Sequence, residues 1–456
     1  MIFFLQNVYF WKLNFINMKE TPIDHSVVSR IIKESGIPKI GKASIREVLR
    51  VVNQIEKETG KKFIRMEMGV PGLMPVEIGT QAEIEALKKG VASKYPLIEG
   101  LPELKNEASR FVKLFLDINI NPEGIIPTVG SMQGGFASFL MSCRRDSKKD
   151  TTLFIDPGFP VQKQQHHVLG LKYETFDVYD FRGDKLKEKL ESYLKKGNIS
   201  TLIYSNPNNP SWICFTDKEL QIIGELAKKY DVIVIEDLAY FGMDFRKDYS
   251  KPGVAPFQPT VAKYTDQYIL LISSSKAFSY AGQRGALLCI SDSLYCRQFP
   301  DLKKYYSSDI FGYATIYGAV YALSSGTSHS VQYALAAILK AVNEGSFNFV
   351  DHVKEYGERA AAMKKIFLDN GFKLVYDKDE DLPLADGFYF TISYPGFTGA
   401  DLIEELLYYG ISAISLDITG SSRTEGLRAC VSQTGKEQFG ELENRLKRFK
   451  ENHLLK

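Results

Sequence analysis

Short apolar runs alternate with longer amphipathic segments from about residue 124 onward. The short runs are apolar at successive positions, which is typical of strands covered on both faces in a mostly parallel sheet. Between two of them, Leu220, Ile223 and Leu226 recur at helical spacing and predict a helix over Asp217–Tyr230. The predicted strands are Ile125–Val129, Thr152–Ile155, Thr201–Tyr204, Val232–Ile235, Ile269–Ile272 and Ala286–Ile290.

This alternation predicts a doubly wound α/β domain over residues 76–340. After about Phe347 the pattern changes and favours a smaller α+β domain, formed by residues 341–456 and 36–75, with residues 1–35 as an N-terminal arm. Arg246–Thr265 reads as a long surface connection. The elements predicted for the smaller domain are helices at Asp351–Asn370, Ala400–Tyr409 and Lys436–Glu451, and strands at Phe388–Ser393 and Ile411–Ile414.

Residues 1–17 are rich in aromatic side chains but are interrupted by Gln6, Asn7 and Lys12. No apolar run approaches the roughly 20 residues that a membrane span needs, and neither a basic leader nor a small-residue cleavage site suggests a secretory signal. We interpret this segment as a disordered arm or as a misassigned start upstream of Met18.

Composition places the chain among ordinary globular proteins, with 44% apolar and 25% charged residues out of 456. The formal net charge of +2 gives no basic field for nucleic acid or an anionic membrane. The five cysteines are scattered, which favours free thiols and a cytoplasmic location. We expect no metal site, since the adjacent His166 and His167 would point apart on a helix.

The most informative residue is Lys276, which follows the apolar run ending at Ile272 in the sequence Ser-Ser-Ser-Lys. A lysine that loses solvation has a lowered pKa, and its amine can then attack a carbonyl to form a Schiff base. Nearby hydroxyls such as that of Ser273, together with Arg284, would suit a phosphate. The implied ligand therefore carries both an aldehyde and a phosphate, and pyridoxal 5'-phosphate (PLP) is such a ligand. When this motif is taken alone, a strand end followed by a solvated turn is the alternative.

Two further motifs follow predicted strands. Gly130-Ser131-Met132 opens a helix, where free backbone N–H groups and the helix dipole favour a phosphate; an ordinary helix cap is the alternative. Asp237 ends a buried strand, where open α/β sheets bind ligands, and it could keep a pyridine nitrogen protonated. Tyr240, three residues on, could reach the phenolic oxygen of the ring. The alternative for Asp237 is capping of the next turn.

Asn209 and Phe159 belong to turns that also follow predicted strands. The Asn-Pro turn at Asn209 can project an amide inward in a fixed geometry, and Phe159 could stack on a flat ring. When each is taken alone, the alternatives are a turn without a function for Asn209 and a core residue for Phe159.

Together these motifs resemble the class I and II aminotransferases, which are fold-type I PLP enzymes, in the family's order from Gly69 to Arg428. The resemblance implies a large PLP-binding domain with a mostly parallel seven-stranded sheet flanked by helices, plus a smaller α+β domain. It implies that Lys276 forms the Schiff base and later shuttles a proton, that Asp237 pairs with the pyridine nitrogen, and that Phe159 stacks on the ring. Tyr240 and Asn209 would bond the phenolic oxygen. Implied phosphate ligands are Ser131 and Met132 through backbone N–H groups, Ser273 and Arg284.

The same resemblance implies roles in substrate binding and assembly. Arg428 resembles the arginine that grips the substrate α-carboxylate, and Gly69 resembles the glycine whose backbone lies against that carboxylate. Tyr95 resembles the tyrosine that reaches the phosphate of a neighbouring subunit, which implies a homodimer with shared active sites.

The chain departs from the family pattern at Trp212, where relatives usually carry Gly, and this places a bulky ring beside the pocket or on its rim. Ser211 replaces Thr, and Met132 stands where several relatives have a polar residue. The implied activity is ping-pong transfer of an amino group from an L-amino acid to a 2-oxo acid. A PLP-dependent lyase or decarboxylase is the alternative, and the sequence does not identify the amino acid.

Overall fold

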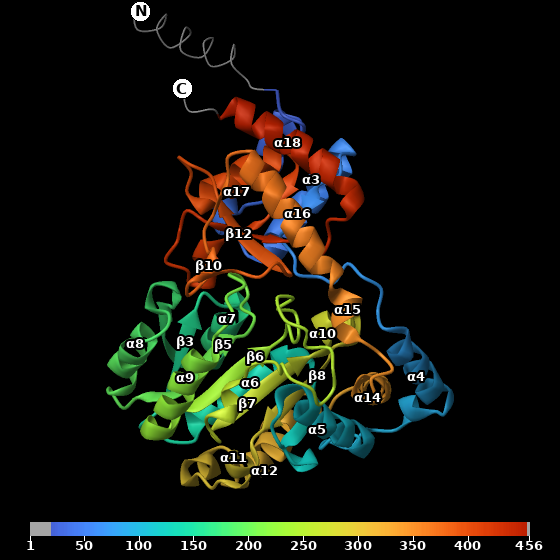
Figure 1. The fold of residues 1–456 in the computed structure, drawn as a ribbon, viewed down its shortest axis with the longest axis vertical. Helices are drawn as coiled ribbons and strands as arrows, with labels where there is room; N and C mark the ends of the chain where they lie inside the picture. The colour runs from blue at the N-terminus through green and yellow to red at the C-terminus, as the bar shows by residue number, and fades with distance from the viewer. Residues whose placement is uncertain (1–19, 454–456) are drawn as a thin grey trace, which may run out of the picture.

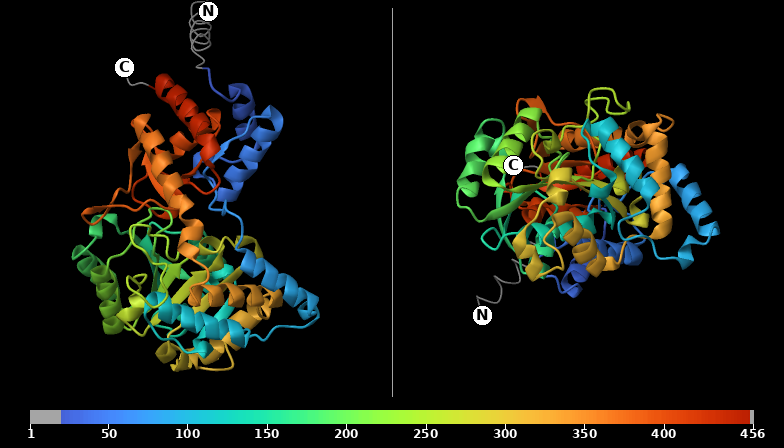
Figure 2. Two further views of the ribbon diagram at one scale, coloured as in Figure 1. Left: turned by 45° about the vertical axis from the view of Figure 1, so that its right-hand side comes forward. Right: turned by 90° about the horizontal axis from the view of Figure 1, so that it is seen from below.

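The computed structural model describes residues 20–453, which form two lobes joined at a narrower waist (Figures 1 and 2). The interpretation of residues 1–17 therefore lies outside the described residues. Among residues 20–453, no helix is both long enough and apolar enough to cross a bilayer. All five cysteines are free thiols.

The lower lobe in Figure 1 is built on a seven-stranded sheet with the order β2-β8-β7-β6-β5-β3-β4. Only β8 runs against its neighbours, so the sheet is mostly parallel as expected. All six predicted strands are present, and the seventh, β4, has no apolar run because it lies at an edge with half-exposed polar side chains. The strands are β2 Ile125–Val129, β3 Thr151–Asp156, β4 Lys172–Asp177, β5 Ile199–Ser205, β6 Ile233–Leu238, β7 Tyr268–Ser273 and β8 Gly285–Ile290.

Both faces of this sheet are buried, which explains the uninterrupted apolar runs. On β5 and β7, for example, Leu202 and Leu270 pack into one core, whereas Ile203 and Ile269 pack into the other. Helix α6 covers the second of these faces, and α5, α8, α9 and α14 cover the first. Helices in this lobe are α4 Glu77–Lys88, α5 Pro102–Leu116, α6 Gly130–Arg144, α7 Pro160–Leu169, α8 Lys185–Leu194, α9 Asp217–Tyr230, α10 Ser274–Ala277, α11 Asp292–Cys296, α12 Phe311–Tyr313, η8 Ala314–Val320 (a π-helix), α13 Tyr321–Ser324 and α14 His329–Asn343.

The upper lobe has its own core, in which helices cover a four-stranded sheet of order β14-β15-β12-β9. Chain segments from both ends build it, because β1 pairs in parallel with β13 and the side chains of Val28 and Ile31 on α2 join this core. Its elements are α2 His25–Glu34, α3 Ile45–Thr59, β1 Ile64–Arg65, α15 Phe349–Val353, α16 Glu355–Asp369, β9 Lys373–Leu374, β10 Lys378–Asp379, β11 Leu382–Pro383, β12 Tyr389–Ser393, α17 Gly399–Tyr408, β13 Ile411–Ser412, β14 Ile414–Ser415, β15 Leu427–Cys430 and α18 Phe439–Asn452.

Several predicted elements of this lobe are divided in the structure. The helix expected over Asp351–Asn370 is two helices, α15 and α16, because a tight turn in which the Lys354 N–H donates to the Asp351 carbonyl (3.3 Å) separates them. The strand expected at Ile411–Ile414 is split between β13 and β14, which belong to different sheets. Short 3₁₀ turns occur at η1 Ile40–Lys42, η2 Val91–Ser93, η3 Pro122–Gly124, η4 Tyr179–Phe181, η5 Val261–Lys263, η6 Ala281–Gln283, η7 Pro300–Lys304, η9 Leu416–Thr419 and η10 Lys436–Gln438.

The topology brings several strand ends to one edge of the large sheet. Strands β3, β5, β6 and β7 are mutually parallel, and β2 shares their direction because β8 is antiparallel to both β2 and β7. The carboxyl ends of these five strands therefore meet the amino end of β8 at the same edge. Each predicted cofactor-binding motif from Ser131 to Arg284 follows one of these carboxyl ends or, in the case of Arg284, immediately precedes β8.

Candidate active site

Lys276 lies on the single helical turn α10 directly after β7. The Ser273 hydroxyl starts this turn by accepting a hydrogen bond from the Ser275 N–H (3.1 Å). The Lys276 amine donates to the Gly69 carbonyl at 2.5 Å. Burial lowers the pKa of Lys276 to about 8, and the positive charges of Arg284 and Arg428 add to this lowering. About a tenth of the amine is therefore uncharged at pH 7, far more than for an ordinary lysine, and the uncharged amine is the nucleophile.

Asp237 lies at the carboxyl end of β6, on the face that α6 covers, since Ile233 and Ile235 of the same strand pack there. Its two carboxyl oxygens accept hydrogen bonds from the Gln162 amide (3.0 Å) and the Ala239 N–H (3.1 Å). Burial raises the pKa of Asp237 to about 6. The charged form of such a buried acid is stabilised by a neighbouring cation, for example a protonated ring nitrogen. Gln162, on α7, escaped the sequence analysis because nothing in its local sequence distinguishes it.

The amino end of α6 has the features of an anion-binding site. Its N-cap residue, Val129, offers no capping side chain, so the N–H groups of Ser131 and Met132 in the first turn have no partner within the helix. Gly130 has a positive φ of 67°, and a Cβ there would overlap the guanidinium of Arg284. Arg284 is exposed and donates one bond to the Ala281 carbonyl (2.9 Å). The helix end and a cation thus lie side by side.

Arg428 is almost fully buried, on β15 between β12 and β14. Its guanidinium donates to the Asn209 side-chain carbonyl (3.1 Å) and to the Glu67 backbone carbonyl (2.6 Å). The Nε atom is buried and has no hydrogen-bond partner among the described residues. An arginine with an unmet donor beside a nucleophilic lysine suits a carboxylate ligand.

Tyr389, on β12, connects these groups and was not singled out from the sequence. Its hydroxyl lies 2.8 Å from the Tyr240 hydroxyl, and its ring lies beneath the Arg428 guanidinium at 4.4 Å. A Cβ on Gly69 would overlap the Tyr389 hydroxyl, which explains a glycine at that position. The predicted residues Gly69, Tyr240 and Arg428 therefore meet around one ring that no sequence motif marked.

Phe159 precedes α7 and is half-buried. Among the described residues, its ring has no aromatic neighbour. The adjacent Gly158 N–H donates to the Thr419 carbonyl (2.9 Å), so this loop is attached to the upper lobe. Its expected role in stacking on the cofactor ring therefore stays a prediction.

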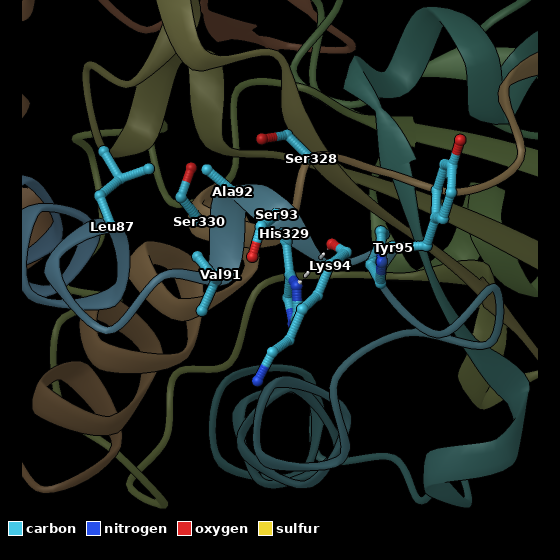
Figure 3. Close-up of a pocket in the computed structure, with 10 residues that line it drawn as sticks. Leu87, Val91, Ala92, Ser93, Lys94, Tyr95, Ser328, His329 and Ser330 are labelled. Carbon is cyan, nitrogen blue, oxygen red and sulfur yellow. Dashed lines mark hydrogen bonds between the residues drawn. The ribbon is translucent and has the colours of Figure 1, made fainter.

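Tyr95 lies elsewhere. Its side chain is 93% exposed, and it lines a pocket of about 610 Å³ between η2 and the start of α14. Figure 3 shows Tyr95 at one side of this pocket, apart from His329. None of the other predicted site residues lines it. The described chain therefore does not place Tyr95 with Lys276, and its expected role depends on a second subunit.

Trp212 is buried in the core of the upper lobe, with 1% of its surface exposed, and so does not lie on the rim of the site. Its ring packs edge-on against Tyr240 at 5.3 Å. Gly387 leaves the space that the indole occupies. The positive φ of Trp212 (66°) is a conformation that glycine adopts without strain, which explains glycine at this position of the motif.

Three features test whether these residues fit PLP. The first is the candidate anion-binding site at the start of α6 beside Arg284. The second is the Lys276 amine after β7, which has a lowered pKa, and the third is the buried Asp237 carboxyl group at the end of β6. PLP needs a phosphate site, an amine for its aldehyde and an acid for its ring nitrogen. The residues present fit the cofactor. Among the described residues, no cluster of His, Cys, Asp or Glu side chains is arranged to hold a metal ion.

Comparison with known proteins gives a family match and several distant relatives. A family model described as aminotransferase class I and II matches residues 61–446. The asparagine–oxo-acid transaminase of Streptococcus mutans is 22% identical over 231 residues, which is 50% of this chain and 56% of that protein. The glutamate–pyruvate aminotransferase of Escherichia coli is 28% identical over 233 residues, 50% of this chain and 54% of that protein. The chain thus spans little more than half the length of these relatives.

Solved structures share the fold over almost the whole chain. An alanine aminotransferase from Pyrococcus furiosus superimposes with a TM-score of 0.74 at 18% identity, covering 91% of this chain and 98% of that one. The aspartate aminotransferase of Thermus thermophilus with maleate gives a TM-score of 0.70 at 18% identity, covering 93% and 98%. At this identity the likeness establishes the fold, which is that of fold-type I transferases.

Proposed function

The chain belongs to the aminotransferase class I and II family, and from this premise we propose that it transfers the amino group of an L-amino acid to a 2-oxo acid. The transfer runs in two half-reactions of a ping-pong cycle, with PLP held by Lys276 as a Schiff base. Bound PLP supplies an electron sink for negative charge that develops at the substrate Cα. The residues of the chain bind, orient and move protons around it.

Lys276 has two tasks in this proposal. Its amine bonds to the cofactor aldehyde, which the lowered pKa of about 8 favours. With the cofactor bound, Lys276 would also be the group that moves the proton between the substrate Cα and the cofactor C4' atom. The contact with the Gly69 carbonyl holds the amine in the site while it is not bonded to the cofactor.

The remaining cofactor ligands act by charge and position. Asp237 would hold a proton on the ring nitrogen, and Gln162 fixes the orientation of that carboxylate. Tyr240 and Asn209 would donate to the phenolic oxygen, and Phe159 would stack on the ring. The phosphate would be held by the N–H groups of Ser131 and Met132, the hydroxyl of Ser273 and the guanidinium of Arg284.

Arg428 and Gly69 bind the substrate. The guanidinium receives the α-carboxylate, whose arrival satisfies the buried Nε donor. Because the Asn209 and Glu67 carbonyls hold the guanidinium, the carboxylate is fixed relative to Lys276 and the Cα–H bond can be turned perpendicular to the cofactor ring.

We also propose that the enzyme is a cytoplasmic homodimer with shared sites. The support is the 93% exposure of Tyr95, whose expected partner is the phosphate bound to the neighbouring subunit. Gel filtration and a Tyr95→Phe variant with weakened cofactor affinity would support this arrangement, and a monomer with full activity would contradict it.

The observation that carries the proposed function is the buried Lys276 amine in contact with Gly69, beside Arg428. The test is an amino-transfer assay with 2-oxoglutarate as acceptor and a panel of L-amino acids as donors. We expect 2-oxo acid product from at least one donor, dependent on acceptor. Release of ammonia, pyruvate or CO₂ without an acceptor would instead identify a lyase or decarboxylase.

A further inference from the structure

Tyr389 contacts both the cofactor ligand and the substrate ligand of the proposed site. Its side chain is buried, with 2% of its surface exposed. On one side its hydroxyl meets that of Tyr240 at 2.8 Å, and on the other its ring faces the Arg428 guanidinium at 4.4 Å. A side chain in this position can influence two functional groups without touching the substrate.

The hydrogen bond between the two hydroxyls has a direction that a bound cofactor would reverse. In the structure Tyr240 donates to Tyr389. A hydroxyl has one hydrogen, so when Tyr240 donates to the phenolic oxygen of PLP it no longer donates to Tyr389. Tyr389 has no other acceptor among the described residues, so its own hydrogen turns to the Tyr240 oxygen. A chain from Tyr389 through Tyr240 to the cofactor results, and each bond strengthens the next.

The ring of Tyr389 supports the guanidinium plane of Arg428. The two Nη atoms are held from the edge by the carbonyls of Asn209 and Glu67. The guanidinium carbon lies over the face of the Tyr389 ring, where a cation is attracted. The two hydrogen bonds limit displacement of the guanidinium, and the contact with the ring limits its tilting. The guanidinium that would bind the carboxylate therefore keeps one orientation.

We propose that Tyr389 is a positioning residue for both partners: its hydroxyl aims the Tyr240 proton at the phenolic oxygen of the cofactor, and its ring fixes the Arg428 fork. This inference rests on the proposed function. It accounts for the packing of Gly69, where any Cβ would displace the Tyr389 hydroxyl, and for the edge-on contact of Trp212 with the same ring at 6.1 Å.

Tyr389→Phe tests the hydroxyl, because it keeps the ring beneath Arg428. The readout is the pH midpoint of the absorption change of the cofactor-loaded protein. Tyr240 stabilises the anionic phenolic oxygen, so a weaker Tyr240 bond raises this midpoint. We expect an upward shift of about 0.2 to 0.7 of a pH unit, with KM almost unchanged. An unchanged or lowered midpoint would overturn the hydroxyl role, since a Tyr389 that merely competes for the Tyr240 proton lowers it when removed.

A double-mutant cycle separates this role from packing. In a Tyr240→Phe background, Tyr389→Phe is expected to leave the midpoint where Tyr240→Phe set it. An equal shift in both backgrounds would contradict the hydroxyl chain. Tyr409→Phe is the matched control, because Tyr409 is also a buried tyrosine of the upper lobe, with a single hydroxyl partner in Asn452 (2.9 Å), and its removal should not move the midpoint.

Tyr389→Leu tests the ring. Relative to Tyr389→Phe, we expect KM for the amino acid to rise about 2- to 30-fold, the range for loss of a cation–π contact, while kcat falls less. An equal KM in the two variants would overturn the ring's role. Wild-type protein that neither binds PLP nor transfers amino groups would end the proposed function itself, a result distinct from any difference among the Tyr389 variants.

Discussion

The two halves of the proposed site are built in different ways. The cofactor half, comprising Asp237, Lys276 and the amino end of α6, sits on strand ends along one edge of the seven-stranded sheet. The substrate half, comprising Gly69, Tyr389 and Arg428, is assembled from segments more than 300 residues apart, and it belongs to the core of the upper lobe.

In one half the position of each group is determined by neighbouring sequence, and in the other it is determined by distant parts of the chain. In the cofactor half, each group is placed by the strand that precedes it, and burial is the largest cause that moves the pKa values of Lys276 and Asp237 towards neutrality. In the substrate half, Arg428 is oriented by two carbonyls and a ring from other parts of the chain. We therefore expect substitutions in the first half to remove chemistry, and substitutions in the second to degrade alignment.

The largest effect should come from Lys276→Ala. Without the amine, neither the bond to the aldehyde nor the proton transfer at Cα is available, so kcat should fall at least about 10⁴-fold, the upper range for a general acid or base. Lys105→Ala is the matched control, since Lys105 is a buried lysine that donates to the Glu99 carbonyl (2.9 Å) and should retain activity. Comparable losses in both variants would mean that the effect at position 276 reflects loss of a buried lysine and not of a chemical group in the site.

Asp237→Asn should rank second. The amide keeps the size of the side chain but removes the charge that holds a proton on the ring nitrogen, and we expect kcat to fall about 10²- to 10³-fold. Glu236→Gln provides the control, because Glu236 is the adjacent buried carboxyl on the opposite face of β6, bonded to Tyr204 (3.1 Å) and Thr260 (2.5 Å). Steady-state kinetics of the two variants would show whether kcat depends on the carboxylate on the Asp237 face of β6 and not on the one on the opposite face.

Trp212→Gly tests how far the substrate half depends on packing. Loss of a buried indole costs about 3 to 5 kcal/mol, and relief of the positive φ returns about 1 to 2 kcal/mol, so the free energy of unfolding should fall by about 1 to 4 kcal/mol. Denaturant melting measures this change. Stability equal to that of wild type would mean that the indole contributes no net packing energy to the core of the upper lobe.

Arg428→Lys should have the smallest of these effects. A lysine keeps the charge but cannot form two parallel bonds to a carboxylate. We expect kcat/KM to fall about 10- to 100-fold, mostly through KM, the range for one hydrogen bond to a charged group. Arg445→Lys, at a buried arginine that donates to the Gly410 (2.7 Å) and Lys62 (2.9 Å) carbonyls away from the site, should leave KM unchanged.

The same division explains what the sequence could predict. The six apolar strands and the motifs after them are local signals, so the sheet and Lys276, Asp237 and Ser131 could be found directly. Strand β4 was missed because an edge strand has a polar pattern.

Tyr389 and Gln162 could not be found, because their importance comes from contacts with Tyr240 and Asp237 that only the folded chain creates. Trp212 was visible as a departure from the family motif, but its burial depends on Gly387, which lies 175 positions further along the chain. Long-range packing of this kind leaves no periodic signal in the sequence.

The most direct test of the account is to identify the lysine that captures PLP. Borohydride reduction of the cofactor-loaded protein, followed by peptide mass mapping, should place the added mass on Lys276. Because the pKa of that amine is lowered to about 8, the initial rate of capture should rise about tenfold per pH unit below pH 8 and level off above it. Label on another lysine, or a rate that continues to rise towards pH 10, would contradict the central claim.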